Sequence, residues 1–273
     1  MSIVTMSPTI GSLGDEIGRE VARARGYEFA DREIIEKAAA RFGEGVMELA
    51  HATEEKPTLW ERFVDTNRRY MTYVEAIVLE LAARDNVVLA GRGSAFLLGR
   101  MRHVLRVRVT APERVRTTRL VEQQGLVSDA AATLVRQSDN ELGGRVRYLY
   151  HVDWNDPLLY DLVISTDRMT VPEGAALIDR ALQNARYQSS VEAMNEIREL
   201  NLTTQCRAAL LAQPDTRPLD LRATYEHGQV TLTGIVEHDE LRQRAEEIVA
   251  KVPGVSTVSN NIVVRQRIVM TAV

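Results

Sequence analysis

Short apolar runs alternate with segments of helical periodicity along the first 190 residues, and this alternation restricts the possible folds more than any other feature of the sequence. The runs are short and mostly uninterrupted by polar residues, as expected for strands that are buried on both faces of a parallel sheet. Strands are expected at about residues 3–7, 27–30, 87–91, 104–109 and 161–165. The pattern predicts an α/β domain with a parallel five-stranded sheet flanked by helices.

Helices are expected between these strands, from apolar spacing and from residues that begin or end a helix. One helical pattern extends from Arg32 to about Arg84, with a break near Lys56-Pro57. A later helix is predicted over residues 128–142, with Ser128 as its candidate N-cap. The pair Gly143-Gly144 is interpreted as a flexible break rather than as a continuation of that helix.

The character of the sequence changes after about residue 190. A further helix reaches Ala212, and the proline-bearing stretch "QPDTRP" follows it. Two alternating strands around His227-Gly228 then predict a hairpin, before an amphipathic helix and a last strand. We therefore expect two domains that fold independently, at residues 1–190 and 200–268, the second being a small α+β unit.

Composition and charge narrow the functional classes. The net charge of −4 and the absence of a dominant basic block argue against a nucleic-acid binder. The N-terminus does not resemble a signal peptide, and no apolar run approaches the roughly 18 residues that a membrane span needs. The single cysteine, Cys206, excludes an internal disulfide and is interpreted as a buried thiol. A soluble cytoplasmic protein is the resulting expectation.

The stretch "TIGSLGDEIGR", from Thr9 to Arg19, joins the first expected strand to the first helix. Glycines at such a junction allow several backbone N–H groups to converge on a phosphate at the positive end of a helix. The strongest form of this loop ends in Gly-Lys-Ser or Gly-Lys-Thr, whereas this chain has Gly14-Asp15-Glu16. The loop alone leaves two readings open: a phosphate loop without its lysine, or an ordinary strand-to-helix turn.

Several stretches carry a family resemblance. The segments "GSLGDEIGREVARARGYEFADREII", "VVLAGRGSAFLL", "RVRVTAPERVRTTRLVEQQGL" and "SDNELGGRVRYLYHVDWNDPLLYDLVISTD" resemble the cytidylate-kinase-like family, a branch of the P-loop nucleoside monophosphate kinases. The segments "GQVTLTGIV" and "VPGVSTVSNNIVV" resemble a BON domain, a module associated with phospholipid surfaces or protein partners. The resemblance implies a P-loop kinase-like fold that uses ATP and Mg²⁺. It does not identify a residue that binds the metal ion.

The resemblance also implies a phosphate-binding set, which comprises Gly11, Ser12, Gly14, Asp15 and Glu16. The family usually has a glycine where this chain has Leu13, and an arginine or serine where it has Asp15. A carboxylate in the first helical turn suits the helix dipole but repels a triphosphate. Without the lysine, the charge of a phosphoryl-transfer transition state needs a cation from elsewhere in the chain.

Two groups of polar residues follow other strands, where ligands of parallel sheets bind. Arg92 lies in "AGRG", where the family binds the nucleoside monophosphate, and its planar fork could hold a phosphate or a pyrimidine edge. Asp31 and Arg32 could reach the same acceptor pocket. The alternatives are a surface ion pair for Arg92 and an N-cap role for Asp31.

The segment from Arg136 to Tyr150 corresponds to the lid of such kinases. The resemblance implies catalytic roles for Arg136, Asp139, Arg145 and Arg147. The family often has an arginine at the position of Leu142. The alternative for the arginines is that they only solvate an exposed helix.

Two functions are weighed. The first is a nucleotide-binding, kinase-like protein that transfers phosphate from ATP to a pyrimidine nucleoside monophosphate. The second is a catalytically degenerate nucleotide sensor or adaptor, whose BON-like domain binds a membrane surface or a protein partner. Leu13, Asp15 and Leu142 favour the second, whereas Gly11-Ser12, Arg92 and Asp139 favour the first. The mixed charges of the BON-like helix argue against simple attraction to an anionic membrane.

Overall fold

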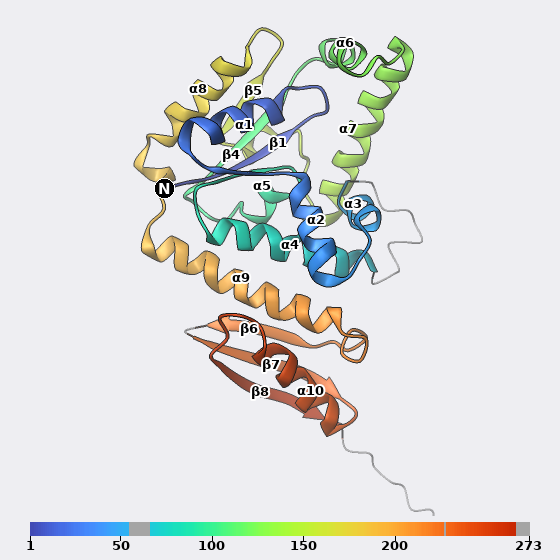
Figure 1. The fold of residues 1–273 in the computed structure, drawn as a ribbon, viewed down its shortest axis with the longest axis vertical. Helices are drawn as coiled ribbons and strands as arrows, with labels where there is room; N and C mark the ends of the chain where they lie inside the picture. The colour runs from blue at the N-terminus through green and yellow to red at the C-terminus, as the bar shows by residue number, and fades with distance from the viewer. Residues whose placement is uncertain (55–65, 227, 266–273) are drawn as a thin grey trace, which may run out of the picture.

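The computed structural model describes residues 1–54, 66–226 and 228–265. Its larger part is built on a five-stranded sheet in which every paired strand is parallel. The strands are β1 (Ile3–Pro8), β2 (Glu28–Ala30), β3 (Val87–Ala90), β4 (Val104–Thr110) and β5 (Leu162–Ser165), in the order β2-β3-β1-β4-β5. The predicted α/β sheet is confirmed, and Figure 1 shows the helices that flank it.

Apolar and polar residues do not alternate along the central strand β1. Its first five residues are all buried, because helices cover both faces of the sheet. Val4 and Met6 belong to the core under α1 (Gly14–Arg25) and α8 (Val171–Leu182), whereas Ile3 packs on the other side with α2 (Arg32–Phe42) and α4 (Thr66–Ala83). Successive side chains of a strand point to opposite faces, so both faces of this strand require apolar residues.

The helical stretch expected from Arg32 to Arg84 is divided earlier than predicted. Helix α2 ends at Phe42, where Gly43 adopts a left-handed conformation (φ 68°), and α3 (Val46–Glu54) follows. The predicted break at Lys56-Pro57 lies outside the described residues. The remaining short helices are α5 (Ser94–Leu97), η2 (Pro157–Leu159) and η3 (Ala185–Tyr187).

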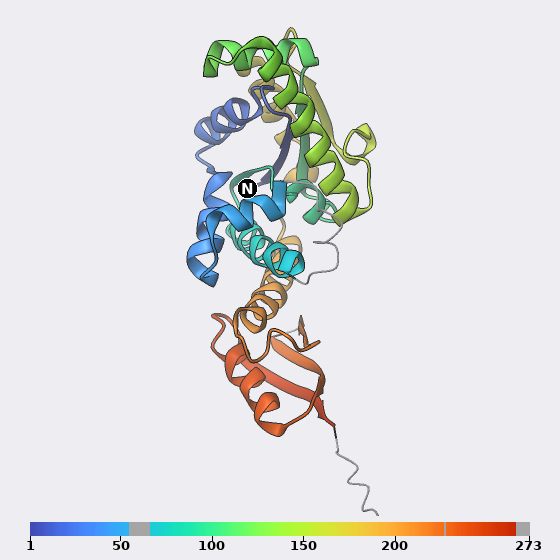
Figure 2. The ribbon, with the colours of Figure 1, turned by 90° about the vertical axis from the view of Figure 1, so that its right-hand side faces the viewer.

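Two predictions for the lid segment are wrong. Helix α7 runs without interruption from Ser128 to Tyr150 after α6 (Glu113–Gln124), and its N-cap is Val127 rather than Ser128. Gly143-Gly144 is therefore helical and not a break. A Cβ added at Gly143 would lie 3.1 Å from Nε1 of Trp154, so this glycine allows a close approach between the helix and the indole. Figure 2 shows α7 as a long straight helix along the side of the larger part.

The smaller part contains β6 (Arg222–Glu226), β7 (Gln229–Val236), α10 (Asp239–Ala250) and β8 (Thr257–Val264). Strands β6 and β7 are antiparallel, as the hairpin prediction required, and β8 joins β7 in parallel. Gly228 takes the expected left-handed turn conformation (φ 89°), while His227 lies outside the described residues.

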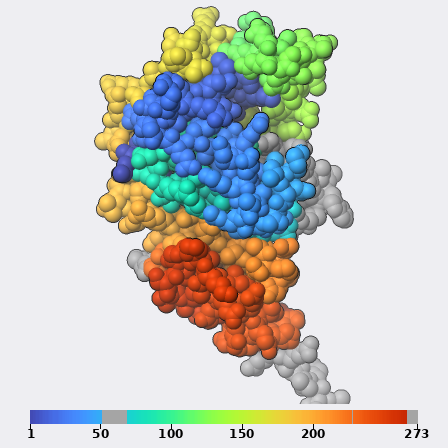
Figure 3. All heavy atoms as spheres, in the orientation of Figure 1, coloured from blue at the N-terminus to red at the C-terminus, as the bar shows by residue number. Residues whose placement is uncertain are grey.

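Helix α9 (Val191–Ala212) lies between the two parts, and Figures 1 and 3 show the small unit below it. Met194 and Ile197 on this helix belong to the core of the larger part, whereas Cys206 and Leu210 belong to the core of the smaller one. Residues 191–200 thus form part of a helix that packs on α4. The domain limits at 190 and 200 remain a prediction.

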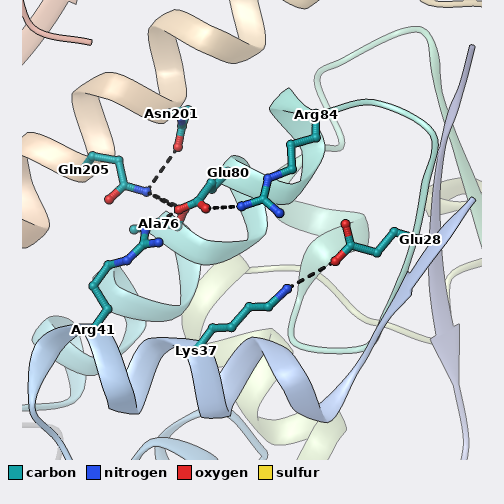
Figure 4. A network of polar contacts seen from close by, with 8 residues as sticks. All are labelled: Glu28, Lys37, Arg41, Ala76, Glu80, Arg84, Asn201 and Gln205. Atoms are coloured by element: carbon teal, nitrogen blue, oxygen red, sulfur yellow. Dashed lines mark hydrogen bonds and ion pairs between the residues drawn. The ribbon is translucent and has the colours of Figure 1, made fainter. Parts of the chain in front are cut away.

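A polar network fastens α9 to the larger part (Figure 4). The Glu80 carboxylate accepts hydrogen bonds from Arg41 of α2 and from Arg84, which directly follows α4. Gln205 of α9 donates to Glu80 (3.4 Å) and to the carbonyl of Ala76 (3.0 Å).

None of the helices in the described part of the chain combines the length and apolarity that a membrane crossing needs.

Candidate functional site

A cavity of about 620 Å³ opens beyond the carboxyl ends of β1, β2 and β3, where parallel sheets bind ligands. Its walls come from the loops after these strands, from α5 and from one side of α7. The predicted site residues that line it are Gly11, Ser12, Gly14, Asp15, Glu16, Asp31, Arg32, Arg92 and Arg145. Three loops that are far apart in the sequence therefore meet at one site.

The loop after β1 has the backbone shape of a phosphate loop. Gly11 (φ 70°) and Leu13 (φ 61°) are both left-handed, and Leu13 is the N-cap of α1. The first hydrogen bond inside α1 runs from the N–H of Ile17 to the carbonyl of Leu13 (3.0 Å). The amides of Gly14, Asp15 and Glu16 precede this bond and have no acceptor within the helix. Leu13 thus keeps a conformation that glycine normally supplies.

Two residues that sequence reasoning missed hold this loop. Arg119 of α6 donates to the carbonyl of Gly11 (3.1 Å) and to the hydroxyl of Thr166 (2.8 Å). The Thr166 hydroxyl in turn donates to the carbonyl of Ser12 (2.8 Å). These bonds engage the backbone carbonyls of Gly11 and Ser12. A polar residue directly after β5 was the only sequence signal for Thr166.

The glycines of the loop are required by close packing. A Cβ at Gly11 would lie 3.0 Å from the carbonyl oxygen of Arg116, and one at Gly14 would lie 2.5 Å from Cβ of Pro8. Both approaches leave no room for a side chain. The loop is consequently fixed from both sides, by contacts to α6 and to the end of β1.

Asp15 lines the cavity near both carboxylates and arginines. Burial raises the pKa of Asp15 above its ordinary value, and the negative charges of Asp31 and Glu16 raise it further. Arg19 and Arg92 oppose this shift in pKa. The expected repulsion between Asp15 and a second negative group is therefore present in the protein before any phosphate binds.

Arg92 occupies an unusual backbone position. It is left-handed (φ 54°) between Gly91 and Gly93, which are also left-handed (both φ 71°). Its side chain is 9% exposed, and Nη2 donates to Oδ1 of Asp31 at 3.4 Å. Burial lowers the pKa of Arg92, and Asp31 opposes this shift. The alternative of an ion pair on the surface does not describe this buried side chain.

Asp31 stands at the N-cap position of α2, but its side chain makes no capping hydrogen bond. Instead, Glu33 accepts a hydrogen bond from the backbone N–H of Asp31 (3.1 Å). Asp31 therefore occupies the N-cap position, but its carboxylate does not cap the helix and instead faces Arg92.

The lid residues are placed differently from one another. Arg145 is 2% exposed and lines the cavity, as does Leu142, where the family often has arginine. Arg136 is exposed and pairs with Glu113 (2.8 Å). Asp139 accepts two hydrogen bonds from Arg116, at 2.9 and 2.6 Å. Arg147 is exposed and does not line the cavity.

Aromatic side chains line another wall. The rings of Phe96 and Tyr150 lie 5.2 Å apart, and the guanidinium of Arg108 lies 3.8 Å from the Trp154 ring. Trp154 is buried and also lines the cavity. Planar apolar surfaces beside cationic groups suit a ligand with a flat ring and a phosphate.

The described residues contain no group of three or more His, Cys, Asp or Glu side chains that could hold a metal ion. Mg²⁺ in phosphate sites is often held by few protein ligands and mainly by the ligand's phosphates and water, so the cavity is compatible with a cation that arrives with a phosphate ligand. The buried hydroxyl of Ser12 has no hydrogen-bond partner among the described residues, as expected of a polar group that meets a ligand.

The parallel sheet, the glycine loop before α1 and the cavity define a P-loop kinase-like nucleotide-binding fold. The sequence profile of the cytidylate kinase-like family matches residues 3–168, and the chain belongs to that family. The BON domain profile matches residues 199–266. Both resemblances inferred from the sequence are thereby confirmed.

Individual relatives agree with this assignment. The cytidylate kinase of Pyrococcus abyssi is 26% identical over 188 residues, which cover 68% of this chain and 96% of that protein. The cytidylate kinase of Thermococcus sibiricus is 28% identical over 188 residues, which cover 68% of this chain and 89% of that protein. An uncharacterised protein from Eubacterium ventriosum shares the fold, with a TM-score of 0.54 and 14% identity over 67% of this chain and 99% of that one.

Proposed function

We propose that this protein transfers a phosphoryl group from ATP to a pyrimidine nucleoside monophosphate. The convergence of the α1 loop, Arg92 and Arg145 on one cavity is the observation that carries this proposal. The names of the related cytidylate kinases support the choice of a pyrimidine acceptor. A cytoplasmic location, where both nucleotides are available, is part of the same proposal.

The first-turn amides of α1, with Gly11, Ser12 and Gly14, would hold the ATP phosphates. Arg92 and Arg32 would bind the acceptor's phosphate from the opposite loops. An oxygen of that phosphate then forms a bond to the γ-phosphorus. The bond from the γ-phosphorus to its bridging oxygen breaks, and ADP leaves with the electron pair.

Arg145 takes the charge-neutralising role in this proposal. Its guanidinium lies in the cavity three residues beyond Leu142, on the same helical face, and it could supply the cation that the loop lacks. Asp139 would act indirectly by fixing Arg116, whose carbonyl lies against Gly11. Arg136 and Arg147 would reach a phosphate only after a movement of α7. When bound with ATP, Mg²⁺ would neutralise part of the phosphate charge.

The test is product formation from ATP, Mg²⁺ and each of CMP, dCMP, UMP and AMP. Arg145→Gln should lower kcat about 100-fold or more if Arg145 stabilises transition-state charge. Arg147→Gln, on the same helix but exposed, is the comparison variant and should lower kcat much less than Arg145→Gln, because Arg147 does not line the cavity. Absence of transfer to every acceptor, with an intact fold, would exclude the kinase function.

A second candidate is a nucleotide sensor or adaptor without catalysis. Asp15 in the phosphate loop favours it, as does α9, which contributes to the cores of both parts. In this case nucleotides bind without turnover, and the BON domain binds a phospholipid surface or a protein partner. Calorimetric titration with nucleotides, followed by vesicle binding with and without the nucleotide that binds, distinguishes the two candidates.

A further inference from the structure

The contact between Arg92 and Asp31 is longer than the contacts in two other arginine–carboxylate pairs of the same domain. Arg106 binds Asp161 through two nitrogens, both at 3.1 Å. Arg116 binds Asp139 in the same two-point manner, at 2.9 and 2.6 Å. Arg92 donates through Nη2 to Asp31 Oδ1 at 3.4 Å, which is longer than a good charge-assisted hydrogen bond. Its geometry is that of a pair that can open.

The surroundings of this pair do not depend on the Asp31 carboxylate. Helix α2 begins without a side-chain cap from Asp31, and Glu33 already accepts the bond from the Asp31 N–H. On the other side, two left-handed glycines flank Arg92, so its loop has more backbone freedom than one built of larger residues. The Asp31 carboxylate thus contacts Arg92 in the wall of the cavity and does not cap α2.

We propose that Asp31 is a displaceable counter-ion for Arg92, a positioning residue that the acceptor's phosphate replaces. This inference rests on the proposed function and assigns Asp31 a role opposite to direct acceptor binding. A phosphomonoester carries up to two negative charges and offers several oxygens to the arginine fork, so it forms the better partner. Asp31 holds Arg92 inside the cavity until such a group arrives, and its charge opposes that group.

Opposite changes in two measurable quantities follow from this role. Removing the Asp31 charge weakens the hold on a buried cation, so the free protein becomes less stable. The same change removes a competitor of the acceptor's phosphate, so the acceptor binds more tightly. A residue with a purely structural role would lower the stability without improving affinity, and a residue that binds the acceptor directly would lower the affinity.

The experiment compares CMP binding by calorimetry for the wild type, Asp31→Asn and Asp31→Ser. Asparagine and serine are both favoured at N-cap positions, so at least one variant should keep the start of α2. We expect both to bind CMP about tenfold more tightly, the scale of one charge-assisted hydrogen bond. Their melting temperatures without ligand should fall. Asp31→Glu restores the charge and should return the affinity towards the wild-type value.

Two controls locate the effect. Glu33→Gln alters the same helix start outside the cavity and should leave CMP affinity unchanged. Cytidine lacks the phosphate, so its affinity should not differ between the wild type and Asp31→Asn. Equal or weaker CMP binding by both uncharged variants overturns the inference but leaves the proposed function standing. Failure of the wild type and all variants to bind any nucleoside monophosphate overturns both.

Discussion

Replacement of Asp15 by asparagine tests the phosphate loop directly. Asp15 is the second residue of α1, where a carboxylate gains about 0.3–1 kcal/mol from the helix dipole. Burial, Asp31 and Glu16 nevertheless raise its pKa above 3.8, so the carboxylate form is disfavoured in the folded protein. The variant should therefore be more stable than the wild type at neutral pH.

The pH dependence has a definite sign. Below its unfolded pKa, Asp15 is protonated in both states and contributes no penalty. As the pH rises through that value towards the higher folded pKa, the unfolded state ionises first and the wild type loses stability. The stability gain of Asp15→Asn should thus appear above about pH 4 and become constant once Asp15 has ionised in the folded state as well.

Asp15→Asn should also strengthen the binding of ATP. Two unit charges 4 Å apart at an effective dielectric near 20 interact by about 4 kcal/mol before screening. Water and salt at an open cavity reduce this to about 1–2 kcal/mol, which corresponds to roughly 5- to 30-fold tighter ATP binding by the variant. Because the effect is electrostatic, it should shrink as the ionic strength increases.

Calorimetric titration with ATP at ionic strengths of about 0.05 M and about 0.5 M measures this dependence. Glu16→Gln removes an adjacent but more exposed charge and should have a smaller effect. If Asp15→Asn binds ATP no more tightly at low ionic strength, the carboxylate does not oppose the phosphates. If the variant loses affinity only when Mg²⁺ is present, Asp15 binds the metal ion and the expected sign is wrong.

Three further predictions concern the scaffold. Gly11→Ala should lower the free energy of unfolding by about 2 kcal/mol, because Gly11 has a left-handed backbone and its added Cβ would contact Arg116. Gly26→Ala should lower it less, because the Cβ added there meets no atom within 4 Å. Equal urea denaturation curves for the two variants would contradict this prediction. Tyr73→Phe should raise that free energy by about 1 kcal/mol, because the buried Tyr73 hydroxyl has no hydrogen-bond partner in the described chain; a lower midpoint in urea would argue for a hidden partner. Burial raises the pKa of Cys206 to about 12, so native protein at pH 8 should resist alkylation until it unfolds, as mass spectrometry can show.

The sheet was predictable because its strands carry their signal locally. Strands β1 and β3 are short apolar runs, and nearly all of their residues are buried because helices cover both faces of the sheet. The contacts that hold the phosphate loop were not predictable in this way. Arg119 and Thr166 lie 108 and 154 residues from the carbonyls they bond, and neither residue has a local pattern that names its partner.

The limits of the two domains also depend on tertiary contacts. Helix α9 has apolar residues on two faces, which is typical of a helix buried between two bodies. Met194 and Ile197 pack on the larger part, while Cys206 and Leu210 pack on the smaller. Composition can reveal the change of character near residue 190, but it cannot assign such a helix to one domain. Whether each part folds alone remains a prediction.

The lid shows how one wrong local inference can leave several candidate residues undistinguished. Leu142, Arg145 and Leu149 all line the cavity, and their spacing of three and four residues is that of one helical face. Arg136 and Arg147 lie off this face and are exposed. An unbroken helix would have selected Arg145 from the sequence alone, but reading Gly143-Gly144 as a break removed the periodicity that makes the selection. The glycine serves the approach of Trp154, a tertiary contact that the sequence does not display.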